Sequence, residues 1–318
     1  MKKPKIALYW CSSCGGCEES VIDIAEVLLD IADGVEIVFW PIALDFKYDD
    51  IEKMPDGEIY LSVINGSIRM DEHERISRLL RRKSRFIAAH GSCAHIGGIF
   101  GLANLYDTPD IFKRIYLDCS SVNNPDEILP GADRAAYGEK YDLPKFLDAV
   151  KPLNDIVSVD YYLPGCPPTP EIIKNGIMAI FANERPPNGT VLSEKKALCD
   201  SCPRRDSKPE KINVERFMRL SEIQWDETRC FLAQRLICLG PSTRGGCSSR
   251  CINANMPCRG CFGAADNVAD YGAKTLSFLA ALLQSTSQNE LEQVADSIPD
   301  MAGLLYRYSL PSSILKRK

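Results

Sequence analysis

The chain has 318 residues, 45% of them hydrophobic and 25% charged, which is the composition of an ordinary globular protein. Its net charge of −5 and pI near 5.4 argue against nucleic-acid binding, which usually accompanies a basic excess. No apolar run approaches the roughly 20 residues of a membrane helix, and the run near the N-terminus is too short for a secretory signal. We therefore expect a cytoplasmic protein without membrane insertion.

The first half of the sequence alternates strand and helix patterns. Apolar residues at helical spacing predict helices over 19–31, 71–84 and 169–183. Short apolar runs predict strands over 5–10, 35–40, 57–66, 85–91 and 156–165. This alternation predicts an α/β fold with a flavodoxin-like, doubly wound parallel sheet.

The composition changes after residue 184. Pro, Asn and Gly over 184–197 predict a linker, and two further helices are predicted over 212–224 and 267–285. The stretch between these helices is rich in Gly, Pro and Cys and cannot bury a large core. We therefore predict two domains, 1–184 and 185–318. The second is smaller, mostly irregular and helical, and cross-linked by bound metal centres.

Fourteen cysteines in a reducing compartment favour metal ligands over disulfides. Three of them, Cys11, Cys14 and Cys17, follow the first predicted strand, and Cys93 and Cys166 directly follow two later strands. The carboxyl ends of parallel strands meet at one edge of a sheet. Two thiols from the first loop, with Cys93 and Cys166, therefore predict a four-thiolate site for an iron–sulfur cluster or zinc.

The other cysteines are concentrated in the second half, where eight lie between Cys199 and Cys261. Eight thiols are enough for two more four-ligand sites. Paired CxxC motifs also build zinc ribbons, so the spacing alone leaves open a zinc-stabilised scaffold without redox activity. An FMN-binding flavodoxin is disfavoured, because the first loop is rich in cysteine instead of the Ser, Thr and Gly that bind phosphate.

Three motifs resemble those of NiFe hydrogenase small subunits: CGGCEES at 14–20, GSCA at 91–94 and PGCPPTPE at 164–171. The stretch over 238–263 is similar to the gamma subunits of the methyl-viologen-reducing, deazaflavin-non-reducing enzymes of methanogens. The related cluster-bearing subunit of respiratory complex I shares the PGCPP loop. It differs in having adjacent cysteines at the first motif and no C-terminal cluster domain.

The resemblance implies three 4Fe-4S clusters, each bound by four cysteines. The implied ligands are a proximal set of Cys14, Cys17, Cys93 and Cys166, a distal set of Cys199, Cys202, Cys230 and Cys238, and a medial set of Cys247, Cys251, Cys258 and Cys261. Membrane-linked relatives have a histidine in place of Cys199 and commonly a three-iron medial cluster. Ligation of a cluster by four thiolates favours a low reduction potential. Cys11 and Cys119 stay outside the three sets, although Cys11 is placed to replace Cys14.

The resemblance also implies a function and partners. The chain lacks a nickel-binding motif, so it is expected to be an electron-transfer subunit with no catalytic residues, inactive alone. The implied partners are a NiFe hydrogenase large subunit, a small iron–sulfur adaptor subunit and heterodisulfide reductase. Small subunits of deazaflavin-reducing hydrogenases and of sulfhydrogenases are the alternatives. Glu19 matches the family's glutamate near possible proton exits, but a carboxylate stabilised at a helix N-terminus is the simpler interpretation and the one we prefer. His90 and His95 flank Cys93 and either adjust the potential of its cluster or are simply partly buried.

Overall fold

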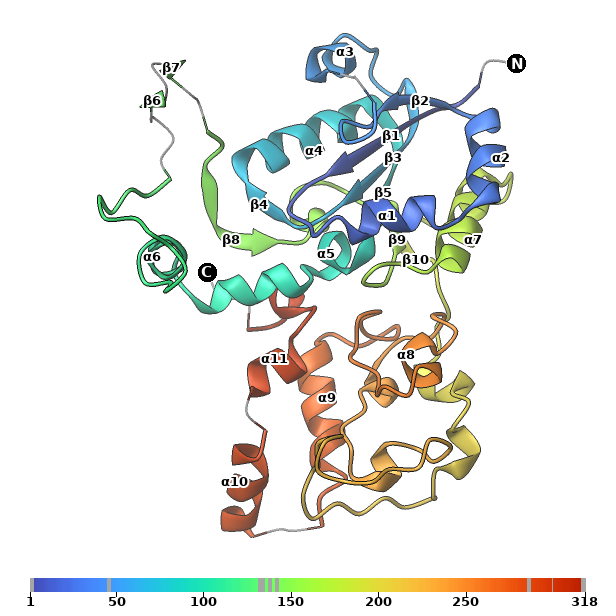
Figure 1. Cartoon of the computed structure of the whole chain (residues 1–318). Helices are drawn as coiled ribbons and strands as arrows, with labels where there is room; N and C mark the ends of the chain where they lie inside the picture. Colours follow the sequence, from blue (N-terminus) through green and yellow to red (C-terminus); the bar gives the residue numbers. More distant parts are fainter. Residues whose placement is uncertain are drawn as a thin grey trace.

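The computed structural model describes residues 3–44, 47–130, 135–136, 139–140, 143–284, 287–298 and 300–315. Figure 1 shows two parts, an upper part with a central sheet between helices and a lower part that is mostly irregular. The sheet confirms the predicted α/β fold. None of the described helices is long and apolar enough to cross a membrane.

The central sheet has six strands in the order β10-β9-β5-β3-β1-β2, and every neighbouring pair is parallel. The strands are β1 (Lys5–Trp10), β2 (Glu36–Phe39), β3 (Ile59–Asn65), β5 (Ser84–His90), β9 (Tyr161–Leu163) and β10 (Thr190–Val191). A separate antiparallel pair joins β4 (Ile68–Met70) to β8 (Phe146–Lys151), and a shorter one joins β6 (Ala135–Ala136) to β7 (Glu139–Lys140).

Helices cover both faces of the sheet because the central strands are apolar on both sides. On one face, Ile76 and Leu80 of helix α4 pack with Ile64 and Ile87 of the sheet. On the other face, Val21 of α1 packs among Leu8, Val63 and their neighbours (Figure 1). The helices of this part are α1 (Gly16–Ile22), α2 (Glu26–Gly34), α3 (Tyr48–Glu52), α4 (Asp71–Lys83), α5 (Gly91–Ile96), α6 (Thr108–Tyr116) and α7 (Pro170–Phe181).

Some predicted elements of the first part differ from the structure. The single helix predicted over 19–31 is two helices, because Ala25 has a φ of 53°, which no helix residue adopts. The strand predicted over 156–165 is regular only at β9. The segment predicted as a linker contains β10, which pairs with β9 and extends the sheet to its edge.

The lower part contains α8 (Arg250–Asn253), α9 (Tyr271–Ala280), α10 (Gln288–Asp296) and α11 (Met301–Leu305). The helix predicted over 212–224 is wrong, because this segment forms no helix and makes isolated bridges at Val214 and Met218. Val214 packs in one apolar cluster and Met218 against another. The segment is therefore held between two cores instead of presenting one helical face.

The C-terminal segment returns to the first part. Pro311, in the 3-10 turn Leu310–Ser312, lies against Gly97 and Gly101, where an added Cβ would be 2.3 Å from its ring. The Gly98 amide also donates to the Tyr308 carbonyl at 2.9 Å. The end of the described chain is therefore fixed beside α5, the helix that carries Cys93.

Candidate iron–sulfur sites

The four proximal cysteines lie on loops and helix starts that follow β1, β5 and β9, all at one edge of the sheet. Burial raises the pKa of Cys17, and the charges of the other three thiols raise it further. Burial likewise raises the pKa of Cys93 to about 12, with smaller contributions from Cys166 and Cys14. Burial and the Cys14 charge raise the pKa of Cys166. All four thiols are therefore near enough to act on one another.

Two glycines allow backbone to pass directly beside these thiols. A Cβ on Gly91, whose φ is 84°, would lie 2.4 Å from the sulfur of Cys17 and 3.5 Å from the carbonyl of Gly165. A Cβ on Gly98 would lie 2.3 Å from the sulfur of Cys93. Only glycine fits at either position, because any side chain would displace a thiol.

A buried serine joins the proximal loops to the second part. The hydroxyl of Ser92, which is 1% exposed, lies 2.8 Å from the Gly165 carbonyl and 2.5 Å from the Cys261 carbonyl. Its backbone amide also donates to Gly165 at 2.7 Å. One residue beside Cys93 therefore contacts both the loop of Cys166 and the backbone of a medial cysteine.

The buried carboxylate beside Cys17 is Glu18, which the sequence motifs did not single out. Glu18 is 6% exposed and accepts hydrogen bonds from Trp40 Nε1 and Asn65 Nδ2, both at 2.6 Å. Burial raises the pKa of its carboxyl group. Glu19 is exposed. Helical spacing could have identified Glu18 from the sequence, because it lies three residues before the buried Val21 and therefore on the inner face of α1.

His90 and His95 make no hydrogen bond to a cysteine sulfur among the described residues. His90 Nε2 lies 3.1 Å from the Cys17 carbonyl and 3.2 Å from the Ser20 hydroxyl. The ring of His95 packs against that of Tyr162 in a tilted arrangement, with the ring centroids 4.7 Å apart. Burial lowers the pKa of each imidazole to about 4, so both are neutral at pH 7.

The four distal cysteines also come together, from segments that span residues 199–238. Burial raises the pKa of Cys199 to about 12, and the charges of the other three distal thiols add to it. The pKa of Cys238 is raised to about 11 in the same way, with contributions from Cys230 and Cys202. Burial and the Cys230 charge raise the pKa of Cys202.

The medial cysteines lie between the other two sets. Burial raises the pKa of Cys261 to about 12. The charges of the proximal Cys166 and of the medial Cys251 and Cys247 also contribute to this rise. Burial raises the pKa of Cys258, with contributions from the distal Cys238 and from Cys261. Medial thiols therefore lie near both other sets, and the Cys258 amide also donates to the Cys238 sulfur at 3.4 Å.

Backbone amides point at several of these sulfurs. In four cases, the backbone amide two residues after the cysteine donates a hydrogen bond to its sulfur. This bond lowers the pKa of the thiol, whereas burial raises it by a larger amount. The donors are Arg204 to Cys202, Gly240 to Cys238, Ser249 to Cys247 and Gly260 to Cys258. Such bonds favour the thiolate, which is the form that binds metal.

Each donor set has the four thiols that a 4Fe-4S cluster requires. No three His, Cys, Asp or Glu side chains in the described ranges are arranged to hold one metal ion. A cluster spaces its thiolates around several irons and presents sulfides that accept hydrogen bonds. Buried donors are available for this purpose, since the hydroxyls of Ser13 and Ser249 have no hydrogen-bond partner among the described residues and lie within two residues of a proposed ligand.

Two cysteines remain outside the sets. Cys11 is buried in the main core with Tyr9 and Ile76, and its sulfur lies 4.0 Å from the Ser77 hydroxyl. It therefore packs in the core beside α4. Cys119 is half-buried and contacts the Ser121 hydroxyl at 3.2 Å.

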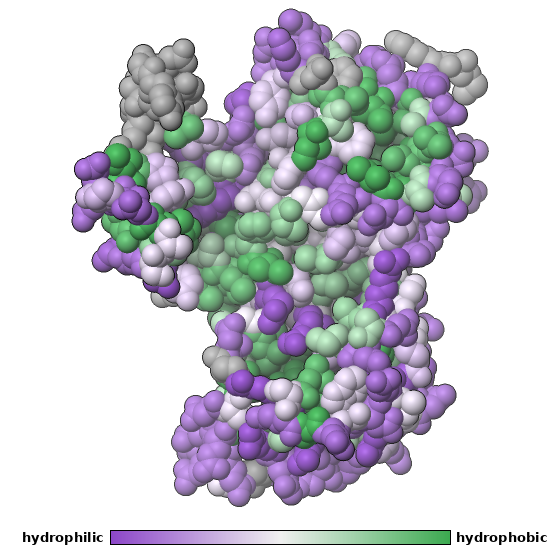
Figure 2. Space-filling view, in the orientation of Figure 1, coloured by the Kyte–Doolittle hydropathy of each residue, from purple (hydrophilic) through white to green (hydrophobic). Residues whose placement is uncertain are grey.

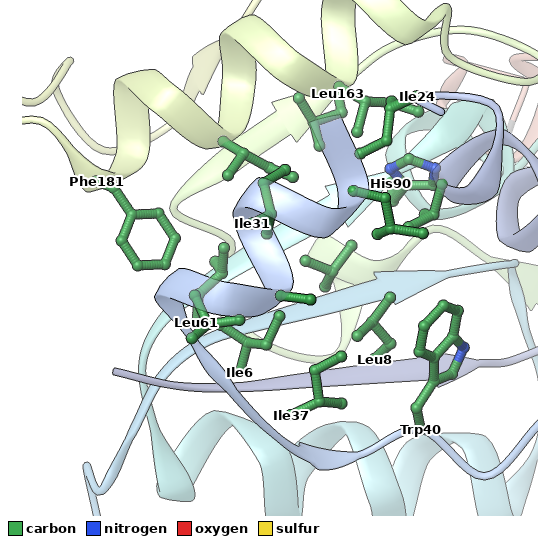
Figure 3. A pocket seen from close by; sticks show the side chains of 17 residues that line it. Ile6, Leu8, Ile24, Ile31, Ile37, Trp40, Leu61, His90, Leu163 and Phe181 are labelled. Carbon is green, nitrogen blue, oxygen red and sulfur yellow. The ribbon is translucent and has the colours of Figure 1, made fainter. Parts of the chain in front are cut away.

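An apolar pocket lies between α2, α7 and the sheet, and Figure 3 shows its aliphatic and aromatic walls. Ile24 and Ile31 line it from the α2 side, Leu163 and Phe181 line it near α7, and His90 is its only ionisable residue. It contains no thiol. The candidate chemistry of this chain therefore lies at the strand ends and in the second part, and not in this pocket.

Comparison with known proteins identifies the family. The family described as NADH ubiquinone oxidoreductase, 20 Kd subunit, matches residues 14–180, which include all four proximal cysteines. The iron-sulfur subunit of an F420-non-reducing hydrogenase of Archaeoglobus profundus is 36% identical over 99% of this chain and 98% of its own length. A subunit of the F420-non-reducing hydrogenase vhu of Methanocaldococcus jannaschii is 36% identical, over 99% of this chain and 97% of its own length.

Solved structures agree with this relationship. A chain of an NAD+-reducing [NiFe]-hydrogenase in the H2-reduced state superposes with a TM-score of 0.50 at 30% identity, over 59% of this chain and 96% of that one. A chain of the [NiFeSe]-hydrogenase of Dm. baculatum shares the fold, with a TM-score of 0.51 at 17% identity over 82% of this chain and 95% of that one. The chain therefore belongs to the NADH ubiquinone oxidoreductase 20 Kd subunit family, in the branch that contains these F420-non-reducing hydrogenase subunits.

Proposed function

We propose that the chain is the electron-transfer small subunit of a cytoplasmic NiFe hydrogenase. In this proposal it holds three 4Fe-4S clusters on the proximal, medial and distal sets. It passes electrons from H2 oxidation in a large subunit to a small iron–sulfur adaptor and heterodisulfide reductase. The observation that carries the proposal is the nearness of the three sets of thiols: Cys261 is near Cys166, and the Cys258 amide donates to the Cys238 sulfur.

When bound, each cluster would accept and release one electron. The chain's own residues supply the surroundings. Cysteines such as Cys93, Cys238 and Cys258 are 6–7% exposed, so protein excludes water from their sulfurs. Backbone amides stabilise the thiolates, and Ser92 fixes the proximal loops against the medial segment. These are the means by which a protein sets the spacing and potential of redox groups.

The proposed large-subunit contact lies beside the proximal set. Cys14 and Cys166 are exposed, and the side chains of Ile22, Ile99 and Phe100 are 60%, 46% and 38% exposed nearby in the chain. Apolar residues that remain exposed around a functional site are typical of a subunit interface. Figure 2 shows hydrophobic surface on the upper part and mainly hydrophilic surface on the lower part. This contrast supports a permanent partner at the proximal end and a transient acceptor at the distal end.

The decisive test is the metal content of the protein, purified without oxygen together with its partners. We expect about twelve irons and twelve sulfides per chain, from three four-iron clusters. We also expect H2 to bleach the cluster absorbance of the complex, and to have no effect on the isolated chain. One zinc per C-terminal site with only four irons would overturn the proposal. Which acceptor the H2-reduced complex then reduces distinguishes this proposal from the sulfhydrogenase and deazaflavin-reducing alternatives.

A further inference from the structure

Arg204 is a buried cation without a carboxylate partner. Its side chain is 5% exposed, and in the described part of the chain it forms no ion pair with Asp or Glu. By contrast Arg244, which is similarly buried, pairs with Asp266. A buried charge is costly unless an opposite charge or several hydrogen bonds compensate it. No carboxylate in the described structure neutralises the charge of Arg204, so this charge can act on its surroundings.

Neutral groups hold the guanidinium in place. Arg204 Nη2 donates to Asn255 Oδ1 at 2.7 Å, and Nη1 donates to the Arg229 carbonyl at 3.3 Å. The guanidinium lies 4.1 Å from the centre of the Phe231 ring and 5.9 Å from that of Trp225. These contacts fix the position of the guanidinium, and none of them brings a negative charge that would neutralise it.

The residues around the guanidinium belong to both candidate sites of the second part. Arg204 follows the distal Cys202 by two positions, and Arg229 and Phe231 flank the distal Cys230. Asn255 lies between the medial cysteines Cys251 and Cys258. The Arg204 charge also acts on the thiol of Cys202. The cation is therefore enclosed by segments that carry the ligands of the distal and medial sets.

We propose that Arg204 is the buried counter-charge of the distal set and raises the reduction potential of the cluster bound there. The inference rests on the proposed function. Reduction adds one negative charge to a cluster, and a fixed positive charge nearby favours the reduced form. Because the guanidinium is buried, salt and water screen it little. Arg204 thus offsets part of the low potential that an all-cysteine distal set, with Cys199 in place of histidine, would otherwise have.

The test is a potentiometric titration of the whole complex, followed by electron paramagnetic resonance. The distal component is identified with Cys199→His, which changes only that ligand set. We expect Arg204→Met to lower the distal potential by about 59 mV, which is about tenfold in a one-electron equilibrium. Arg204→Lys keeps the charge and should restore most of the shift. Arg229→Met removes an exposed arginine next to Cys230 and should shift the potential far less.

A second variant tests the charge without removing the arginine. Asn255→Asp places a carboxylate at the existing 2.7 Å contact, so it should lower the distal potential while the fold is kept. The proximal potential serves as an internal control and should not move. If all three clusters are present but neither Arg204→Met nor Asn255→Asp lowers the distal potential, the role of Arg204 is refuted and the proposed function stands. If no distal cluster is found in the unaltered complex, the proposed function itself fails.

Discussion

The two parts of the molecule hold their cysteines in opposite ways. In the first part, an aliphatic core of residues such as Ile64, Ile76 and Ile87 forms the fold, and the proximal thiols lie on loops at its edge. In the second part, Cys238 and Cys258 are themselves members of the apolar core. The first part therefore folds around its sheet and presents a site at the strand ends, whereas the second part includes thiols of its candidate sites in one of its two apolar clusters.

The largest effect is expected from removing a core cysteine. Cys238→Ala should abolish the proposed distal cluster and loosen the segments around it, because Cys238 lies inside an apolar cluster and metal binding there would supply folding free energy. Cys14→Ala removes an exposed ligand and should cost about four irons while the sheet stays intact. Iron content and limited proteolysis distinguish the two. A protease-resistant second part in Cys238→Ala would contradict the comparison.

The next largest effect is expected from Gly91→Ala. The added Cβ would lie 2.4 Å from the Cys17 sulfur, so the proximal cluster should be lost or its magnetic spectrum altered. Gly57→Ala is the matched control, because Gly57 also has a positive φ, 72°, but has nothing within 4 Å of an added Cβ. Both variants bear the backbone cost of roughly 1–2 kcal/mol. Equal spectra of the proximal cluster in both variants would show that the close approach is irrelevant.

Ser92→Ala tests the connection between the two parts. It removes a hydroxyl that contacts the Gly165 and Cys261 carbonyls, so we expect a loss of roughly 1–3 kcal/mol in the free energy of unfolding. The magnetic interaction between the proximal and medial clusters should weaken as well. Ser309→Ala is the control, because its buried hydroxyl has no partner in the described structure. Equal thermal stability of the two variants would argue against the connection.

The smallest effect at neutral pH is expected from His73, whose contribution to stability changes only in acid. Burial lowers the pKa of His73 to about 4, while its backbone-facing nitrogen accepts from the Arg69 amide at 3.3 Å. Between pH 6.5 and 4 the unfolded chain therefore binds a proton that the folded chain does not. Stability falls as pH falls through this window, by about 1.4 kcal/mol per pH unit for one such group. His73→Gln should flatten the dependence of the melting temperature on pH, and an unchanged slope would contradict the assignment.

Much of the first part could be predicted from the sequence because its signals are local. Continuous apolar runs marked β1, β3 and β5, and cysteines directly after strands marked the proximal set. The second part resisted prediction because its signals are not local. Residues 212–224 have apolar spacing that suits a helix, yet Val214 and Met218 serve different clusters. The return of Pro311 to Gly97 and Gly101 depends on residues about 210 positions apart, which no local pattern records.

The order of the thiol sets along the molecule differs from their order along the chain. The distal cysteines end at Cys238, and the medial cysteines, which lie between the two ends, begin only at Cys247. A nascent chain leaving the ribosome thus possesses both terminal sets before it possesses the set that joins them. Under the proposed function, the path for electrons would be complete only after the segment from Cys247 to Cys261 has been synthesised.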